Sequence, residues 1–394
     1  MKKTSFAILC LEGAVLSFNF AAGATLVPSI AKEFNSSQFV VGMNNWIYML
    51  AYGAAALLYG PLVTLFDAKK IELFCFFLFC LANLVAAFSH NLGTFFIARF
   101  FMGIFGASVV PLVFIVIGRY AKAENRGKLV GVFFSITFFA SLAGLFLSGI
   151  IPWRMIFLIP AIFGLVLWIH MRRYLEDFRT STDTLTINYR AALKNKAVVL
   201  IFTYIFFISV FYYGLQQWLG VYLSQKYNFA QFIISMLVTL TSLSGILGEL
   251  AGGWFSDALG RIKTINSGIV LMILAVVLLL CNVPKIVLAV IMIVWGIGWT
   301  LNHAGLSALL TDMPAQFLNE SASLNSSVRF LAGGLGALMG GILMKENFNL
   351  HFIVCGTGLF LLALFSKTLL RTKDSFFGSA TGRGQKNVPM GRGE

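Results

Sequence analysis

The chain has 394 residues, of which 59% are hydrophobic and only 11% are charged, and its mean hydropathy is +0.87. This composition excludes a water-soluble two-domain protein, in which charged and polar residues would be far more frequent. The formal charge of +14 does not indicate nucleic-acid binding, because Lys and Arg fall in the short breaks between apolar runs.

Uncharged runs of about 18 residues or more are typical of transmembrane helices, which satisfy their own backbone hydrogen bonds in hydrocarbon. The sequence contains twelve such runs, so we predict an all-α membrane protein. The first six spans are expected at residues 5–30, 38–66, 71–89, 93–118, 128–150 and 153–171. The second six are expected at residues 197–225, 230–256, 263–283, 285–311, 319–344 and 350–370.

The longest internal polar segment, residues 172–196, separates the two sets of spans and is the expected linker between two six-helix halves (1–171 and 197–370). Residues 371–394 are Gly-rich, basic and aperiodic, and are predicted to be a disordered tail. The first apolar run is too long for a signal peptide and is interpreted as a retained span. Five scattered cysteines without C-x-x-C spacing indicate neither a metal site nor a disulfide framework.

Basic residues predict the orientation, because loops that stay in the cytoplasm are enriched in Lys and Arg. Twelve spans place both termini and the linker on one side, and 22 of the 29 Lys and Arg residues fall there. The exceptions are five residues on the opposite side and two within spans: Lys32, Arg154, Lys226, Lys285, Lys345, Arg99 and Arg329. We therefore expect a multi-pass protein of the bacterial inner membrane with both termini in the cytoplasm.

The two halves repeat a charged loop. The segment Gly60–Lys70, after the second span, aligns without gaps on Gly253–Lys263, after the eighth. In the first copy Thr64 stands where the second has Asp257, and Ala68 stands where the second has Arg261. The second copy is therefore the more complete of the two.

Three further segments share a pattern with known transporters: R-F-F-M-G-I-F-G-A from Arg99, W-R-M-I-F from Trp153, and the basic loop 119–128 that ends E-N-R-G-K. With the repeated loop they resemble the major facilitator superfamily over nearly the whole chain, and most closely its bacterial drug- and sugar-efflux proton antiporters. One departure is that the fifth span has Ala140–Gly144, without the Gly-Pro pair usual in that branch. The resemblance implies two pseudo-symmetric six-helix halves with cargo bound between them near the bilayer midplane.

The resemblance also implies a conformational latch formed by Gly253, Asp257, Gly260 and Arg261. In the family the aspartate faces the N-terminus of a helix in the other half, where the helix dipole stabilises a carboxylate. The glycines would allow the close approach and the tight turn that such a latch needs. The alternative is that these are ordinary loop charges that anchor helix ends.

Charged side chains within spans are costly and therefore indicate function. The candidates for proton coupling are Glu12, Arg99, Glu249, His303 and Arg329. The last three are expected at one depth on the eighth, tenth and eleventh spans, where they could form a proton relay. The alternative is that Arg329 neutralises Glu249 and that His303 only packs.

Arg99 is expected to take part in proton coupling or cargo binding by resemblance, or else to bond backbone carbonyls of the first or second helix. Spans one, four, seven and ten line the cavity in the family. Asn19, Gln216, Trp299 and Asn302 on these spans are therefore the expected cargo contacts. As an alternative, polar and aromatic residues of this kind also anchor helix ends at the membrane interface.

The sequence therefore predicts a secondary transporter that works by alternating access, is driven by protons and exports a drug, metabolite or siderophore. A proton-coupled importer of sugars, organic acids or amino-acid-like solutes is the first alternative. A membrane sensor or assembly subunit that has lost transport is the second. No phosphate-binding loop, nucleophile elbow or metal-ligand spacing is present in the sequence, so we expect no enzyme activity and no cofactor. We also expect no nucleic acid partner, and a monomer in the lipid bilayer.

Overall fold

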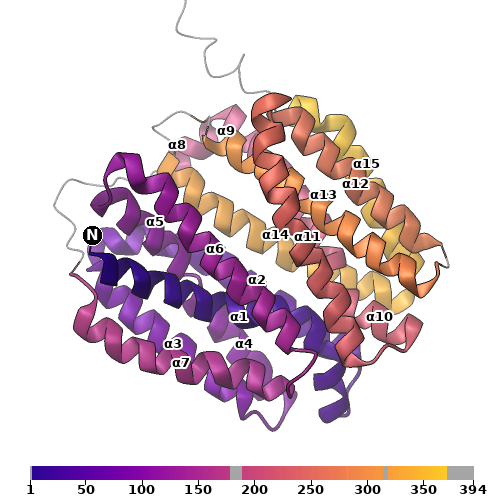
Figure 1. The fold of residues 1–394 in the computed structure, drawn as a ribbon, viewed down its shortest axis with the longest axis horizontal. Helices are drawn as coiled ribbons and strands as arrows, with labels where there is room; N and C mark the ends of the chain where they lie inside the picture. Colours follow the sequence, from indigo (N-terminus) through magenta and orange to yellow (C-terminus); the bar gives the residue numbers. More distant parts are fainter. Residues whose placement is uncertain (1, 178–188, 282, 312, 314–317, 371–394) are drawn as a thin grey trace, which may run out of the picture.

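The computed structural model describes residues 2–177, 189–281, 283–311, 313 and 318–370, and it is helical throughout this part of the chain. Its fifteen helices in chain order are α1 (Lys3–Glu33), α2 (Gln38–Leu65), α3 (Ala68–Ala87), α4 (Leu92–Gly106), α5 (Val109–Tyr120), α6 (Ala123–Leu147), α7 (Trp153–Tyr174), α8 (Tyr189–Lys194), α9 (Lys196–Gln216), α10 (Leu219–Tyr227), α11 (Gln231–Ala258), α12 (Arg261–Leu280), α13 (Lys285–Thr311), α14 (Leu318–Glu346) and α15 (Phe348–Leu369). They supply twelve segments long and apolar enough to cross a membrane, which confirms the predicted number of spans. Figure 1 shows α1–α7 on one side of the molecule and α11–α15 on the other. The predicted tail and residues 178–188 of the predicted linker lie outside the described residues.

Two spans are each built from two helices, which the hydropathy pattern did not predict. The fourth span breaks between α4 and α5 because Pro111 has no N–H for the carbonyl of Ala107. The seventh span breaks between α9 and α10 at Gln217 and Trp218, where no proline is present. There the indole Nε1 of Trp218 donates to the Ala337 carbonyl on α14 (2.7 Å), so tertiary contacts fix this break.

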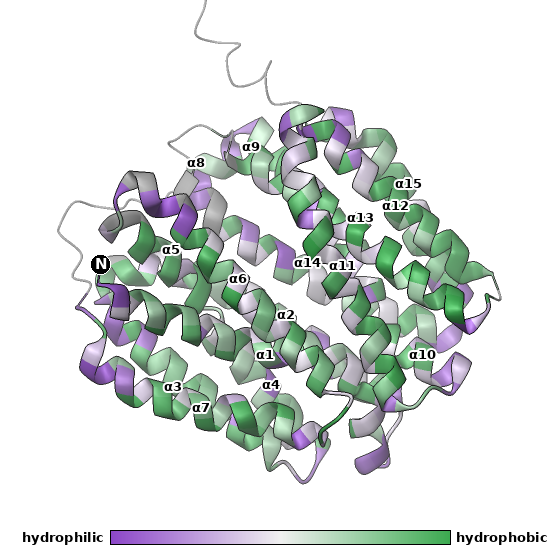
Figure 2. Ribbon diagram, in the orientation of Figure 1, coloured by the Kyte–Doolittle hydropathy of each residue, from purple (hydrophilic) through white to green (hydrophobic). Residues whose placement is uncertain are grey.

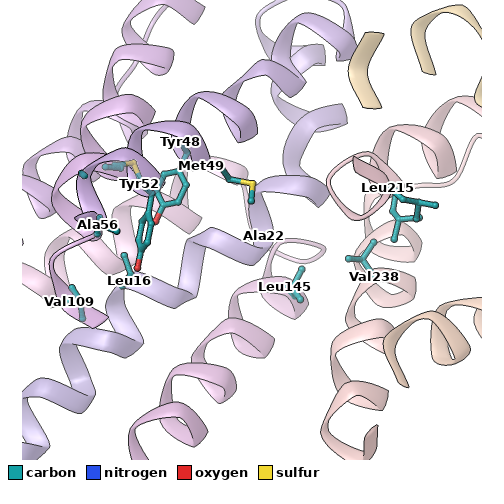
Figure 3. Packing of buried hydrophobic residues seen from close by; sticks show 14 of the residues in the cluster. Leu16, Ala22, Tyr48, Met49, Tyr52, Ala56, Val109, Leu145, Leu215 and Val238 are labelled. Atoms are coloured by element: carbon teal, nitrogen blue, oxygen red, sulfur yellow. The ribbon is translucent and has the colours of Figure 1, made fainter. Parts of the chain in front are cut away.

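The outward surfaces of the helices are apolar, as expected for contact with lipid. Large exposed hydrophobic side chains occur on both sets of helices, for example Ile97, Leu250 and Ile286. Figure 2 shows hydrophobic residues along most of the helix lengths, with hydrophilic residues gathered toward many of the helix ends. Inside, apolar side chains fill each set of helices, as Figure 3 shows for Tyr48, Tyr52 and Leu16 and, further away, for Leu215 and Val238.

The helix bundle has two ends. The linker side contains the start of α1 and the C-terminal ends of α2 and α7, and the far side contains the C-terminal end of α1. On the linker side the amide of Lys2 donates to Glu176 (2.9 Å), which lowers the pKa of that carboxyl and ties α1 to the end of α7. On the far side Arg154 bonds Glu33 (2.6 Å) and the carbonyls of Ala87 and Ser89. The Trp153–Arg154 pair therefore joins the start of α7 to the C-terminal ends of α1 and α3.

Helices α2 and α14 form the longest contact between the two sets of helices. Their backbones approach closely at Gly53, where an added Cβ would lie 2.6 Å from the Leu331 nitrogen. The Ser327 hydroxyl donates to the Gly53 carbonyl (2.6 Å), and the Phe330 ring stacks on Tyr52 with centroids 3.9 Å apart. A side chain at Gly53 would force these helices apart.

Most of the hydrogen bonds between the two sets of helices lie on the far side, and we call this group the far-side bridge. Gln231 on α11 accepts from Ser29 Oγ (2.9 Å) and donates to the carbonyls of Thr25 (2.9 Å) and Ser148 (3.3 Å). The bridge also contains the hydroxyl pair Ser148–Ser235 and the bond from Gln38 to Ser224. Close backbone contact at Gly220, where a Cβ would lie 2.4 Å from the Ala24 carbonyl oxygen, seals the same region.

Candidate functional site

Glu249 and His303 meet inside the membrane-spanning part of the second set of helices. His303 Nδ1 lies 3.2 Å from Glu249 Oε1 and 3.3 Å from Oε2, which joins α13 to α11. Both side chains keep access to the surroundings, with 36% of His303 and 46% of Glu249 exposed. An imidazole and a carboxylate at this separation can pass or share a proton.

Arg329 on α14, the third predicted member of this group, is close but not directly paired. Its guanidinium is buried, and Nε donates to Asn325 Oδ1 (2.8 Å) one turn earlier in the same helix. Nη1 and Nη2 have no hydrogen-bond partner among the described residues. Glu249 acts on the Arg329 charge electrostatically without forming a salt bridge within that part of the chain. The simple ion pair of the alternative interpretation is therefore not seen.

Aromatic rings lie beside Arg329 and His303. Trp299 stacks on Tyr212 with centroids 3.6 Å apart, and its centroid lies 6.2 Å from that of His303. The Arg329 guanidinium carbon is 5.9 Å from the Trp299 centroid. Of the four predicted cargo contacts, Trp299 therefore lies directly against the charged group.

Gln216 lies at the end of α9, one turn beyond Tyr212. Its Oε1 accepts from the indole of Trp295 (2.9 Å), and its Nε2 donates to Thr241 (3.4 Å). Because Trp295 also stacks on Tyr212, Gln216 positions the same aromatic group that holds Trp299.

The other two predicted cargo contacts turn into their own sets of helices. The Asn19 amide donates to Asn83 on α3, and the Asn302 amide donates to the Tyr204 hydroxyl (2.6 Å) and to the Ile265 carbonyl (3.2 Å). Both residues are fully buried. Each amide nitrogen therefore bonds within its own set of helices, which favours a role in helix packing, while Oδ1 of both residues has no partner among the described residues.

Arg99 on α4 is buried against α2. Its Nε donates to Asn44 Oδ1 (3.1 Å), and its guanidinium carbon lies 4.5 Å from the centroid of the Tyr48 ring. The observed partners are thus an amide side chain and an aromatic ring, rather than the backbone carbonyls of the alternative interpretation. Its Nη1 has no partner among the described residues.

Glu12 pairs with Glu72, a residue that the sequence analysis missed. Both carboxyl groups are buried and lie close enough to interact electrostatically, and none of their four oxygen atoms has a hydrogen-bond partner in the described part of the chain. Two carboxylates this close in an apolar interior repel strongly, so such a pair requires a proton on one of the two groups. Glu72 resembled a loop charge because it follows Lys70, yet it shares the buried face of α3 with Cys75, Phe76 and Phe79. That helical spacing was the available signal.

Asp257, the carboxylate of the predicted latch, is not engaged with the described residues of the other half in this conformation. Asp257 binds Arg261 within its own loop (2.5 Å) and its side chain is 78% exposed, and the described residues show it no partner on α1–α7. Gly260 adopts φ +95° directly before α12, a backbone conformation that favours glycine. Nothing lies within 4 Å of an added Cβ at Gly253, so the expected close approach is absent here. In the first copy Asp67 caps α3 through the amide of Lys69 (2.8 Å).

The comparison with known families decides what kind of protein carries this arrangement. The family model described as Major Facilitator Superfamily matches residues 9–341 and, in a second match, residues 231–390. The chain belongs to the major facilitator superfamily. It is a secondary transporter rather than an enzyme, as the resemblance implied.

Curated relatives of this transporter agree. The uncharacterized MFS-type transporter YwfA of Bacillus subtilis is 25% identical over 355 residues, which cover 85% of this chain and 86% of YwfA. The probable efflux pump mfs2 of Aspergillus flavus is 28% identical over 187 residues, which cover 43% of this chain and 44% of that pump.

Solved structures show the same fold. The D-xylose-proton symporter superposes with a TM-score of 0.76 at 16% identity, covering 92% of this chain and 96% of the symporter. The nucleoside transporter NupG superposes with a TM-score of 0.72 at 16% identity, covering 92% of this chain and all of NupG. At these identities the likeness shows the fold alone.

Proposed function

We propose that this major facilitator transporter exports a small molecule, a drug, metabolite or siderophore, in exchange for protons. The observation that carries the proposal is the contact between Glu249 and His303 inside membrane spans. A carboxylate and an imidazole that touch each other and stay accessible form a site that can load and release a proton. Arg329 lies near enough for the charge of Glu249 to act on it, so protonation of Glu249 would change the electrostatic environment of this buried cation.

The first set of helices contributes a second group to this proposal. Glu12 and Glu72 lie together in the interior without a hydrogen-bond partner among the described residues, and Arg99 has no carboxylate partner in that part of the chain. A buried carboxyl pair is stable only while one of the two groups keeps a proton, since two like charges in a membrane interior repel strongly. Glu12 and Glu72 therefore act in proton coupling together, while Arg99 holds α4 against α2.

We also propose that the linker side faces the cytoplasm, since most Lys and Arg residues lie there. The far-side bridge then closes the protein toward the outside, and the open loop at Gly253 belongs to a conformation that faces inward. Asp257 forms the latch in the opposite conformation, in which the linker side is closed. The transporter works as a monomer.

The direction of transport is supported by the residues shared with bacterial efflux antiporters and by the efflux pump among the relatives. Import with protons is the second candidate, favoured by the likeness of the fold to a xylose-proton symporter. Inverted membrane vesicles with an acidic interior separate the two. An exporter that exchanges protons accumulates cargo in such vesicles, whereas a symporter does not.

The proton site is tested with Glu249→Gln in these vesicles, using a cargo found by thermal-shift screening of the purified protein. We expect the variant to fold and bind cargo but to lose accumulation driven by the pH gradient. Glu346→Gln, at an exposed carboxyl on the end of α14, serves as the matched control and keeps full accumulation. Full proton-driven accumulation by the Glu249 variant would refute the proposed site.

A further inference from the structure

Arg329 carries a positive charge that the described residues leave without an ion-pair partner. Its side chain is only 7% exposed, and both terminal nitrogens are shielded from solvent without an acceptor in the described part of the chain. Only Nε is used, by Asn325 on the same helix. Buried charged donors are costly unless they are paired, and a guanidinium is built to hold a carboxylate through two parallel hydrogen bonds.

The acid nearest to this guanidinium is already occupied. Glu249 contacts His303 at 3.2 Å and influences Arg329 only from a distance. The other buried acids of the described chain are Glu12 and Glu72, which lie together in the first set of helices, and Glu320, which lies at the start of α14 near Tyr189. No carboxylate of the described chain therefore bonds the two terminal nitrogens of Arg329.

The surroundings of the guanidinium are aromatic. Trp299 lies 5.9 Å from the guanidinium carbon and stacks on Tyr212, while the Tyr213 ring approaches Trp299 at 5.9 Å. The residue after Arg329, Phe330, reaches the first set of helices, where it stacks on Tyr52. One fixed positive charge therefore lies beside the Trp299 ring, which is itself packed among other aromatic rings, while the next residue of α14 contacts α2.

We infer that Arg329 is the recognition point for the carboxylate of an organic anion whose aromatic or apolar body lies against Trp299 and its neighbouring rings. One guanidinium beside the acidic Glu249 suits a monoanion better than a doubly charged phosphate, which would require a second cation nearby. This inference names the chemical class of the cargo in the proposed function. It depends on that function only in assuming that the ligand bound at Arg329 is the transported cargo.

The test measures binding to the full-length purified protein, without a gradient or flux. Matched pairs of probes are used: indole-3-acetate with indole-3-acetamide, 3-phenylpropionate with 3-phenylpropionamide, and salicylate with salicylamide. The acids are expected to raise the melting temperature and to bind about ten to a hundred times more tightly than their amides, the range for hydrogen bonds to a charged group. Equal affinity within the pairs, or no binding by any acid, would overturn the inference.

Arg329→Met removes the charge while keeping an apolar side chain of similar length. We expect it to abolish the preference for acids over amides, whereas Arg173→Met, at an exposed cation on α7, retains it. Without ligand, Arg329→Met should melt at the same temperature as the wild type or higher, because an unpaired buried charge has been removed. A lower melting temperature, or an unchanged preference for acids, would assign Arg329 a structural role instead.

This experiment is independent of proton coupling. A Glu249→Gln variant that loses proton-driven accumulation but still prefers acids supports both proposals. Accumulation that persists in Glu249→Gln, together with acid binding that depends on Arg329, removes the proton site and keeps the anion site. Proton-driven accumulation of cargo with no preference for acids removes only the anion site.

Discussion

The far-side bridge should set the balance between the conformation described here and one that is open on the far side. Gln231→Ala removes three hydrogen bonds between the two sets of helices, to Ser29, Thr25 and Ser148. At about 1 kcal/mol net for each bond, with part recovered by water, the closed far side loses about 2–3 kcal/mol. The ratio of closed to open molecules should then fall about 30- to 150-fold.

Spin labels on the exposed far-side positions Lys32, on α1, and Gln225, on α10, report this change by electron–electron distance measurement. The exposed Cys281 is replaced by serine so that it does not take up label. In detergent or nanodiscs, Gln231→Ala should shift the distance distribution toward a longer, open population. Asn349→Ala, at an exposed amide on α15, is the matched control and should leave the distribution unchanged.

The result that would refute this reasoning is an unchanged distance distribution in a Gln231→Ala protein that is folded and melts normally. Equal widening in the Asn349→Ala control would also refute it, because the effect would then not depend on bonds between the two sets of helices.

Two further predictions concern charges near the linker side. Asp257→Asn should stop transport while leaving the melting temperature of this conformation unchanged, since an ion pair this exposed contributes little stability. Asp67→Asn should transport normally, because asparagine can also cap the start of α3. Equal loss of flux in both variants would contradict the asymmetry of the two loops. Two buried carboxylates that lie together repel, so one group of the Glu12–Glu72 pair has to stay protonated. The wild type should therefore lose thermal stability with rising pH, and Glu72→Gln should flatten that dependence. Melting curves measured across pH check this, and identical slopes in both proteins would contradict it.

Hydrophobic runs predicted the twelve spans because the bilayer imposes length and composition directly on the sequence. The break at Trp218 could not be predicted in this way, since it depends on a bond to α14, which is distant in the sequence. The same holds for Asn19 and Asn302. The sequence places both residues on membrane spans, but the rotation of each helix determines whether the side chain faces cargo or a buried partner. The contact between Glu249 and His303 could be predicted, because ionisable residues inside membrane spans are rare and usually pair with one another.

Helix α11 links the parts of this transporter that have to move together. Its 28 residues span about 42 Å, with Gln231 of the far-side bridge at one end and Asp257 of the proposed latch at the other. Glu249 lies between them, where it contacts His303. With the bridge closed, Asp257 is exposed and pairs only within its own loop among the described residues. A rocking motion of α11 that opens the bridge would bring Asp257 toward α1–α7. In the proposed mechanism, a change of charge at Glu249 acts on the one helix that both ends share, and proton binding there selects between the two conformations.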